Sequence, residues 1–117
     1  MTKLEILTEA RRLLVDVGWT QGQSRAFRMG DVTGYCATGA LAEATRNLHK
    51  EPSWQQELSN AAHSNYHGAL AALNDGVRAR TQNLHAEVVP WNDTTGRTKA
   101  EVLDLFDAAI AATGETK

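Results

Sequence analysis

Cys36 is the only cysteine of the chain, and it lies at the expected start of a helix. The helix dipole and free backbone N–H groups at such a position favour a thiolate nucleophile. A cysteine enzyme also needs a base and a group that orients it, for which Asn92 or Asp93 is available. The candidate bases are the four histidines His49, His63, His67 and His85.

No spacing in the sequence ties a histidine to Cys36. A free cysteine in an alanine-rich helix is more often a small buried hydrophobic residue, which is our main interpretation. We therefore expect no enzymatic activity. A small cysteine-dependent enzyme or polar-ligand-binding protein, centred on Cys36 and the Trp91-Asn92-Asp93 segment, is the alternative.

His63 and His67 are four residues apart, so a helix would place both imidazoles on one face, a spacing that can hold zinc. No glutamate follows His63 directly, and no third ligand lies at a diagnostic distance. We expect a solvated or core-edge histidine pair, with no bound metal and no cofactor.

Trp91, Asn92 and Asp93 have a structural interpretation, in which the indole anchors a loop and the two polar side chains bond backbone amides. In the functional interpretation, Asn92 and Asp93 face residues 34–36 and help to line a small pocket for a polar ligand. The candidate ligand- or partner-binding residues are Trp19, Arg25, Phe27, Arg28, Asn92 and Asp93.

Residues 20–33 have no helical periodicity, and a connection of this length within one domain is usually functional, mobile or locally structured. One interpretation is an arm that covers the core with Phe27 and Met29, and the other is a binding segment. We predict two partner-binding surfaces, residues 21–29 and a face of the third helix. That helix face carries Gln55, His63 and His67.

The first helix should begin at Thr2, which forms a capping box with Glu5, and should end at Gly18. Trp19 follows directly and is expected to fold back and be partly buried. The apolar face of this helix consists of Ile6, Ala10, Leu13 and Val17.

The second helix should start near Thr33 or Gly34 and occupy the centre of the domain, because its apolar stripe is rich in small residues. Gly39 inside it costs about 1 kcal/mol relative to alanine, so we expect another segment to pack on this glycine. The stripe consists of Ala37, Ala40, Leu41, Ala44 and Leu48.

A third helix is predicted to start at Trp54, after a capping box of Ser53 and Gln56, and to stop at residues 74–76. Residues 77–84 are either a further helical turn or an extension of it. Residues 87–90 should be extended, because a residue before proline disfavours helical angles.

Residues 91–96 are predicted to form a loop, followed by a closing helix capped by Thr98 and Glu101, with a frayed tail after residue 113. The apolar face of the closing helix contains Val102, Leu103, Leu105, Phe106, Ala109 and Ile110. These elements predict an all-α fold, a single domain over residues 1–117 with four or five helices and an ordered loop between the first two.

The formal net charge of -2 provides no field that would attract nucleic acid or an anionic membrane, so we expect neither partner. A single cysteine cannot form an internal disulfide, and the first residues lack a secretory signal. No apolar run reaches the length of a membrane span. These features predict a cytoplasmic protein.

Three short elements recur in one order: Gly18-Trp19-Thr20, then Cys36 with Gly39-Ala40, then Trp91-Asn92-Asp93. Together they resemble a family of small uncharacterised proteins from actinobacteria and their bacteriophages. The resemblance implies a phage or actinobacterial origin and a helical accessory protein. We expect it to act by binding a host or phage protein, with self-association through a small-residue helix face as a further alternative.

Overall fold

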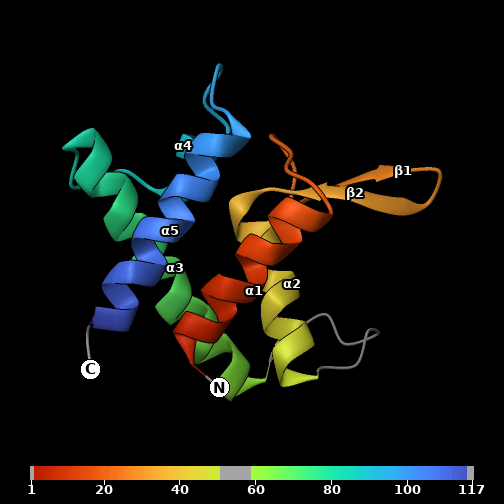
Figure 1. Ribbon diagram of the computed structural model, residues 1–117, viewed down its shortest axis with the longest axis horizontal. Coiled ribbons are helices and arrows are strands. Elements are labelled where there is room, and N and C mark those ends of the chain that lie inside the picture. The colour runs from red at the N-terminus through yellow and green to blue at the C-terminus, as the bar shows by residue number, and fades with distance from the viewer. Residues whose placement is uncertain (1, 51–58, 116–117) are drawn as a thin grey trace.

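The computed structural model describes residues 2–50 and 59–115, which form five helices and one β-hairpin (Figure 1). Helix α1 lies at the centre and contacts α2, α3 and α5. The elements are α1 (Lys3–Asp16), β1 (Arg25–Arg28), β2 (Asp31–Tyr35), α2 (Ala37–His49), α3 (Asn60–Thr81), α4 (Val88–Asn92) and α5 (Lys99–Glu115).

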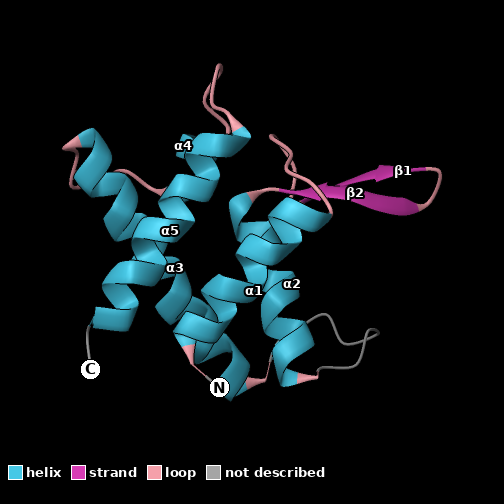
Figure 2. Cartoon of the chain, in the orientation of Figure 1, coloured by secondary structure: helices cyan, strands magenta, loops and turns pink. Residues whose placement is uncertain are grey.

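The domain is mainly helical, but the prediction of a strictly all-α fold is wrong, because β1 and β2 form a two-stranded antiparallel sheet (Figure 2). Arg28 pairs with Asp31 across a two-residue turn. Both turn residues have positive φ, 52° at Met29 and 87° at Gly30. Such turns match the twist of antiparallel strands, so the connection of residues 20–33 folds locally into a hairpin.

Helix α1 begins as predicted, with a complete capping box between Thr2 and Glu5. It ends at Asp16, so Val17 is the C-cap and is 38% exposed instead of joining the buried face. Gly18 has a φ of 143°, and a Cβ there would overlap the backbone oxygen of Thr33. The glycine therefore both ends the helix and lets β2 approach it closely.

Helix α2 starts later than predicted, because Gly34 belongs to β2 and the N-cap is Cys36. The expectation that something packs on Gly39 is confirmed. A Cβ at Gly39 would overlap the backbone oxygen of Ser24 at the base of the hairpin. The helix and the hairpin are thus in direct backbone contact.

Helix α3 begins at Asn60 with Ser59 as its N-cap, and the predicted start at Trp54 lies outside the described residues. The predicted stop at residues 74–76 is wrong, because α3 continues to Thr81. A Cβ at Gly76 would lie 2.7 Å from Leu105 Cδ1, so this glycine provides room for α5. Residues 77–81 are therefore an extension of the same helix.

Residues 88–92 form the short helix α4 instead of the predicted extended segment. Pro90 lies in the first turn, where a helix needs no N–H from it. Trp91 and Asn92 are consequently helical, and only Asp93, the C-cap, begins the loop. Asn74 Oδ1 accepts a hydrogen bond of 2.8 Å from the N–H of Val88, which attaches α4 to α3.

The predicted capping box of α5 is confirmed by reciprocal hydrogen bonds between Thr98 and Glu101. The helix continues to Glu115, past the predicted point of fraying at residue 113. Arg11 Nε donates to Asp107 Oδ1 at 2.6 Å and links α1 to α5. The largest fully buried apolar side chains are Phe106, Ile6, Leu7, Leu14, Leu41, Leu73 and Leu105.

None of the helices in residues 2–50 and 59–115 combines the length and the hydropathy that crossing a membrane requires.

Candidate functional site

The structure brings the three motif elements of the sequence together at the side chain of Asn92. Asn92 Oδ1 accepts from Trp19 Nε1 at 2.8 Å and from the N–H of Ala37 at 3.1 Å. Its Nδ2 donates to the backbone oxygen of Thr20 at 3.2 Å and to Asp93 Oδ1 at 2.9 Å. We refer to these five residues as the Asn92 junction.

Asn92 is 1% exposed, and the four contacts use both lone pairs and both N–H groups of its amide. Gly22 N–H donates to Asp93 Oδ1 at 2.9 Å, and Gln21 Nε2 donates to the oxygens of Asn92 and Thr94. The segment that leads into the hairpin is therefore bound to α4. With its amide fully occupied, Asn92 has no polar group left for a ligand.

The Cys36 side chain is 7% exposed, and its interior position agrees with the main interpretation of the sequence. Its sulfur accepts from the N–H of Gly39 at 3.3 Å and lies 3.3 Å from Thr38 Oγ1. Within the described residues, no imidazole lies within hydrogen-bonding distance of this sulfur. The thiol caps α2, as a serine would.

Tyr66 of α3 lines a small cavity together with Thr38 and Gly39 at the start of α2. Burial raises the pKa of the Tyr66 hydroxyl, and the negative charge of an ionised Cys36 would raise it further, whereas Arg46 lowers it. A neutral phenol is a hydrogen-bond donor and not a base, so a raised pKa does not favour Tyr66 as an acceptor of the thiol proton. Neither side chain is therefore arranged as the base–nucleophile pair of a cysteine enzyme.

Three of the four histidines that could serve as bases, His49, His63 and His67, have other side-chain partners. His49 Nε2 lies 3.3 Å from Asn65 Nδ2, and His63 and His67 lie 2.6 Å apart through their Nε2 atoms. His63 and His67 are both exposed on α3. Across residues 2–50 and 59–115, no group of three or more histidine, cysteine, aspartate or glutamate side chains is placed to hold a metal ion.

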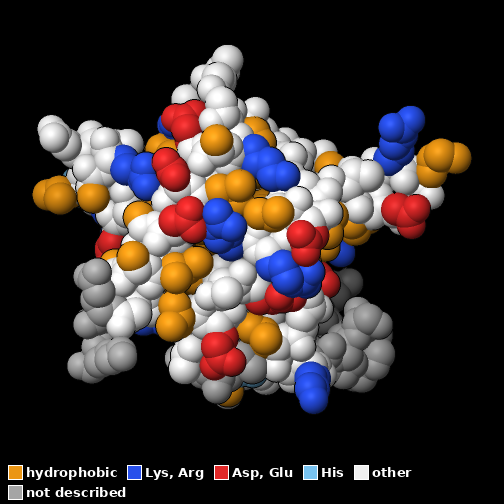
Figure 3. Space-filling model, in the orientation of Figure 1, with side chains coloured by type: hydrophobic (Ala, Val, Ile, Leu, Met, Phe, Trp, Pro, Cys, Tyr) orange, Lys and Arg blue, Asp and Glu red, His pale blue; other side chains and the backbone are white. Residues whose placement is uncertain are grey.

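The hairpin carries the remaining predicted site residues, and we call residues 25–32 the arm. Phe27 is 58% exposed and Met29 is 95% exposed, so the interpretation that they cover the core is wrong. The Arg25 guanidinium lies 5.4 Å from the centre of the Phe27 ring. Figure 3 shows hydrophobic, basic and acidic side chains together at the free end of the arm.

The six predicted residues fall into two groups in the structure. Trp19, Asn92 and Asp93 belong to the Asn92 junction, whereas Arg25, Phe27 and Arg28 lie on the arm. Gln55, predicted on a partner-binding face with His63 and His67, lies outside the described residues.

Sequence reasoning missed one further feature, a pair of adjoining cavities of about 410 and 470 Å³ that share Thr81, Trp91 and Arg97. Their walls come from the end of α3, the connection to α4, α4 itself and the start of α5. Trp91 in the third motif element is the only signal that could have drawn attention to them.

The fold and the junction define a small, mainly helical domain with a projecting β-hairpin. The chain belongs to a family of unknown function, DUF6197, whose model matches residues 1–112. Neither the curated proteins nor the solved structures contain a match to this chain.

Proposed function

We propose that this protein is a small non-enzymatic accessory protein that binds a host or phage protein through the arm. The observation that carries the proposal is the exposure of Phe27 (58%) and Met29 (95%) at the end of a rigidly based hairpin. Exposed large apolar side chains that project together are typical of protein interaction sites.

The base of the arm is fixed on both sides. Cys36 N–H donates to the Ser24 oxygen at 3.1 Å, and Tyr35 N–H donates to the Gly18 oxygen at 3.0 Å. Beyond this base, the two strands pair with each other, and the contacts of α1 and α2 with the hairpin are mainly with β2. A two-stranded hairpin without further packing is only marginally stable in water, so a partner that covers the arm would stabilise it.

The arm also carries charges that suit a protein surface. Arg25 and Arg28 are exposed on β1, and Arg25 lies close to the Phe27 ring. Arginine and aromatic side chains contribute more than other residues to binding energy at protein interfaces. The origin of the protein in an actinobacterium or its phage, inferred from the motif resemblance, indicates which host cells should contain the partner.

A pull-down from an actinobacterial host lysate tests the proposal. Immobilised wild-type protein should recover a specific partner, and the double variant Phe27→Asp, Met29→Asp should recover at least about tenfold less of it. Leu84→Asp is the matched control, because Leu84 is 83% exposed but lies in the connection between α3 and α4.

Recovery of nothing above background, or equal recovery by the wild type and the arm variant, would contradict the proposal. Circular dichroism of both variants should match the wild type, since the substituted side chains are exposed.

A further inference from the structure

The two cavities around Trp91 adjoin through Thr81, Trp91 and Arg97, and we call the combined space the Trp91 cleft. Their volumes, about 410 and 470 Å³, are within the range of small-molecule sites. The other residues that line the cleft are Val77, Arg80, Asn83, His85, Ala86, Glu87, Pro90, Thr94 and Glu101.

The indole N–H of Trp91 has no hydrogen-bond acceptor among the described residues, although the residue is only 7% exposed. No buried side-chain nitrogen or oxygen of the described chain lacks a hydrogen bond, so this N–H must reach solvent. Trp19 differs, because its indole N–H donates to Asn92. The N–H of a largely buried tryptophan usually has a hydrogen-bond acceptor. Because the Trp91 N–H has none within the described residues, it is available to donate to a ligand.

Arg97 supplies a second available donor. Its guanidinium carbon lies 4.0 Å from the centre of the Trp91 ring, its Nε donates to the Trp91 oxygen at 3.0 Å, and its Nη1 donates to Glu101 at 2.9 Å. These contacts hold the guanidinium in one orientation on the indole. Its Nη2 makes no hydrogen bond to a described residue and can donate to a ligand.

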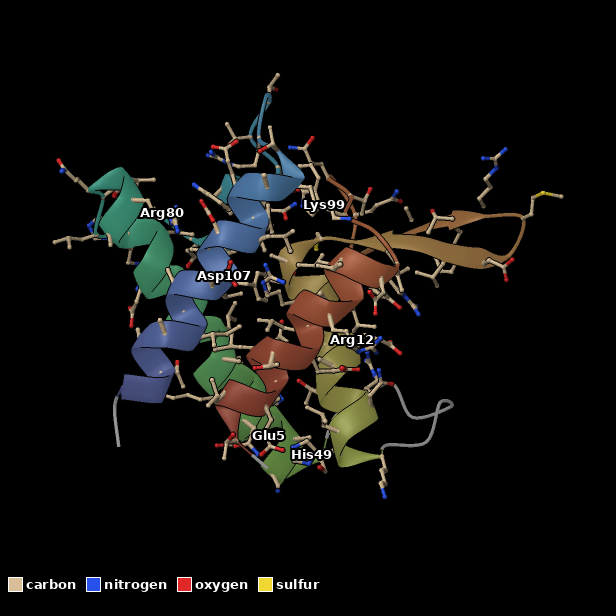
Figure 4. All side chains as sticks on the ribbon, viewed as in Figure 1. Glu5, Arg12, His49, Arg80, Lys99 and Asp107 are labelled. Atoms are coloured by element: carbon tan, nitrogen blue, oxygen red, sulfur yellow. The ribbon has the colours of Figure 1, made fainter. Side chains whose placement is uncertain are left out.

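Arg80 adds a second positive charge to the cleft. It lies near the end of α3 (Figure 4). It lines the same cavity as Arg97 and makes no ion pair with any described residue. The Glu101 carboxylate is already occupied, since Oε1 accepts from Thr98 and Oε2 from Arg97. The Thr98 backbone N–H and Arg97 lower the Glu101 pKa, so Glu101 stays ionised beside Arg97.

The other part of the cleft is less polar. Val77, Ala86 and Pro90 line it together with the Trp91 ring, and Glu87 lies in the same cavity. Glu87 disfavours an anion in this part by charge repulsion. A ligand should therefore place its charge near Arg80 and its apolar group against Val77 and Pro90.

We propose that the Trp91 cleft binds a small organic anion that consists of an oxyanion joined to an apolar ring. The oxyanion accepts hydrogen bonds from Trp91 Nε1, Arg97 Nη2 and Arg80, which come from α4, the loop before α5 and α3. A phosphate or a carboxylate can fill this role. The inference does not depend on the proposed partner binding, because none of its residues belongs to the arm.

Titration of phenyl phosphate, followed by the indole N–H resonances of the three tryptophans in ¹H–¹⁵N spectra, tests the proposal. The Trp91 resonance should shift saturably, while the Trp19 resonance, whose N–H is bonded to Asn92, should stay in place. Benzoate in a parallel titration decides whether a carboxylate binds as well as a phosphate does.

Arg80→Ala should weaken phenyl phosphate binding about tenfold, the usual effect of losing one charge-assisted hydrogen bond. Arg28→Ala removes an exposed arginine of the arm and should leave the affinity unchanged. Inorganic phosphate and phenol should each bind at least about tenfold more weakly than phenyl phosphate, because each lacks one half of the ligand.

Three results would overturn the proposal: no shift of the Trp91 resonance at 10 mM phenyl phosphate, an equal shift of the Trp19 resonance, or unchanged affinity in Arg80→Ala. Arm variants that lose partner recovery should still bind phenyl phosphate, so failure of one proposal is distinguishable from failure of the other.

Discussion

The Asn92 junction and the arm, two neighbouring parts of the molecule, use their side chains in opposite ways. At the junction, Asn92 satisfies every donor and acceptor of its amide inside the protein. On the arm, Phe27 and Met29 leave most of their surface in water. Cys36 and Asn92, the residues that most suggested chemistry in the sequence, thus stabilise the fold. The arm, which has no helical pattern in the sequence, has side chains that remain exposed for contact with another molecule.

The largest effect should come from Gly39→Ala, where α2 meets the hairpin base. The new Cβ would overlap the backbone oxygen of Ser24. Because this oxygen belongs to the backbone and not to a flexible side chain, it cannot move away easily. We expect a loss of about 3 kcal/mol or more in the free energy of unfolding, measured by urea denaturation. The control is Gly68→Ala in α3, whose Cβ would meet only Lys3 side-chain atoms at 3.6 Å.

Gly68→Ala should raise the free energy of unfolding by up to about 1 kcal/mol, because alanine favours a helix more than glycine does. Equal stability of the Gly39→Ala and Gly68→Ala variants would show that the hairpin base is not fixed on α2.

Asn92→Ala should lower the free energy of unfolding by about 2–3 kcal/mol. It leaves the N–H groups of Trp19 and Ala37 without their acceptor in a buried place. Asn83→Ala is the control, since the exposed Asn83 side chain accepts only from the N–H of His85 and its loss should cost less than about 1 kcal/mol. Similar costs for the two variants would remove the distinction between the junction and the surface.

Thiol labelling measures how accessible the Cys36 side chain, next to the Asn92 junction, is to a reagent in the native protein. Cys36 is 7% exposed and should react with a thiol reagent at least about 100-fold more slowly in the native protein than in urea. A Cys36→Ser, Met29→Cys variant places the thiol on the arm, where Met29 is 95% exposed, and should react as fast as an unfolded thiol. Rapid native labelling of Cys36 would revive the cysteine-enzyme alternative.

The smallest effect on stability should come from the arm itself. Phe27→Ala should change the free energy of unfolding by less than about 0.5 kcal/mol, because Phe27 is largely exposed. Phe106→Ala, which empties a fully buried site, should cost about 3–5 kcal/mol in the same thermal or urea experiment. A large cost for Phe27→Ala would mean that the arm packs on the domain in solution.

Local signals in the sequence predicted the starts of α1 and α5, where the stabilising contacts are local. The capping boxes at Thr2 and Thr98 each join residues three positions apart, so their patterns are complete in the sequence. Gly39 was also informative, because a glycine inside a helix has a cost that only close packing explains. The identity of the packed segment, Ser24, was not predictable from this signal.

The predicted stop of α3 was wrong because the residues there contact segments that are distant in the sequence. Gly76 and Asn74 have the composition of a helix stop, yet Leu105 and Val88 use them as packing space and hydrogen-bond acceptor, so α3 continues. The hairpin was missed because Met29, an unfavourable residue for positive φ, occupies its turn.

The candidate sites show the same division. The motif residues Trp19, Cys36 and Asn92 were identified. The roles of Trp19 and Asn92 depend on hydrogen bonds between segments more than fifty residues apart, whereas the Cys36 thiol bonds locally to Gly39. The Trp91 cleft combines residues from α3, α4 and the start of α5, and no sequence spacing links them.

By itself, the sequence determined one mainly helical domain, the start of its first and last helices and the interior position of Cys36, since hydrophobic periodicity and capping act over a few residues. Only the tertiary structure decided that the Asn92 amide makes all its hydrogen bonds inside the protein, that the Trp91 indole N–H makes none there, and that Phe27 and Met29 are exposed to water. These outcomes depend on which distant groups meet each side chain, and that is settled when the helices pack.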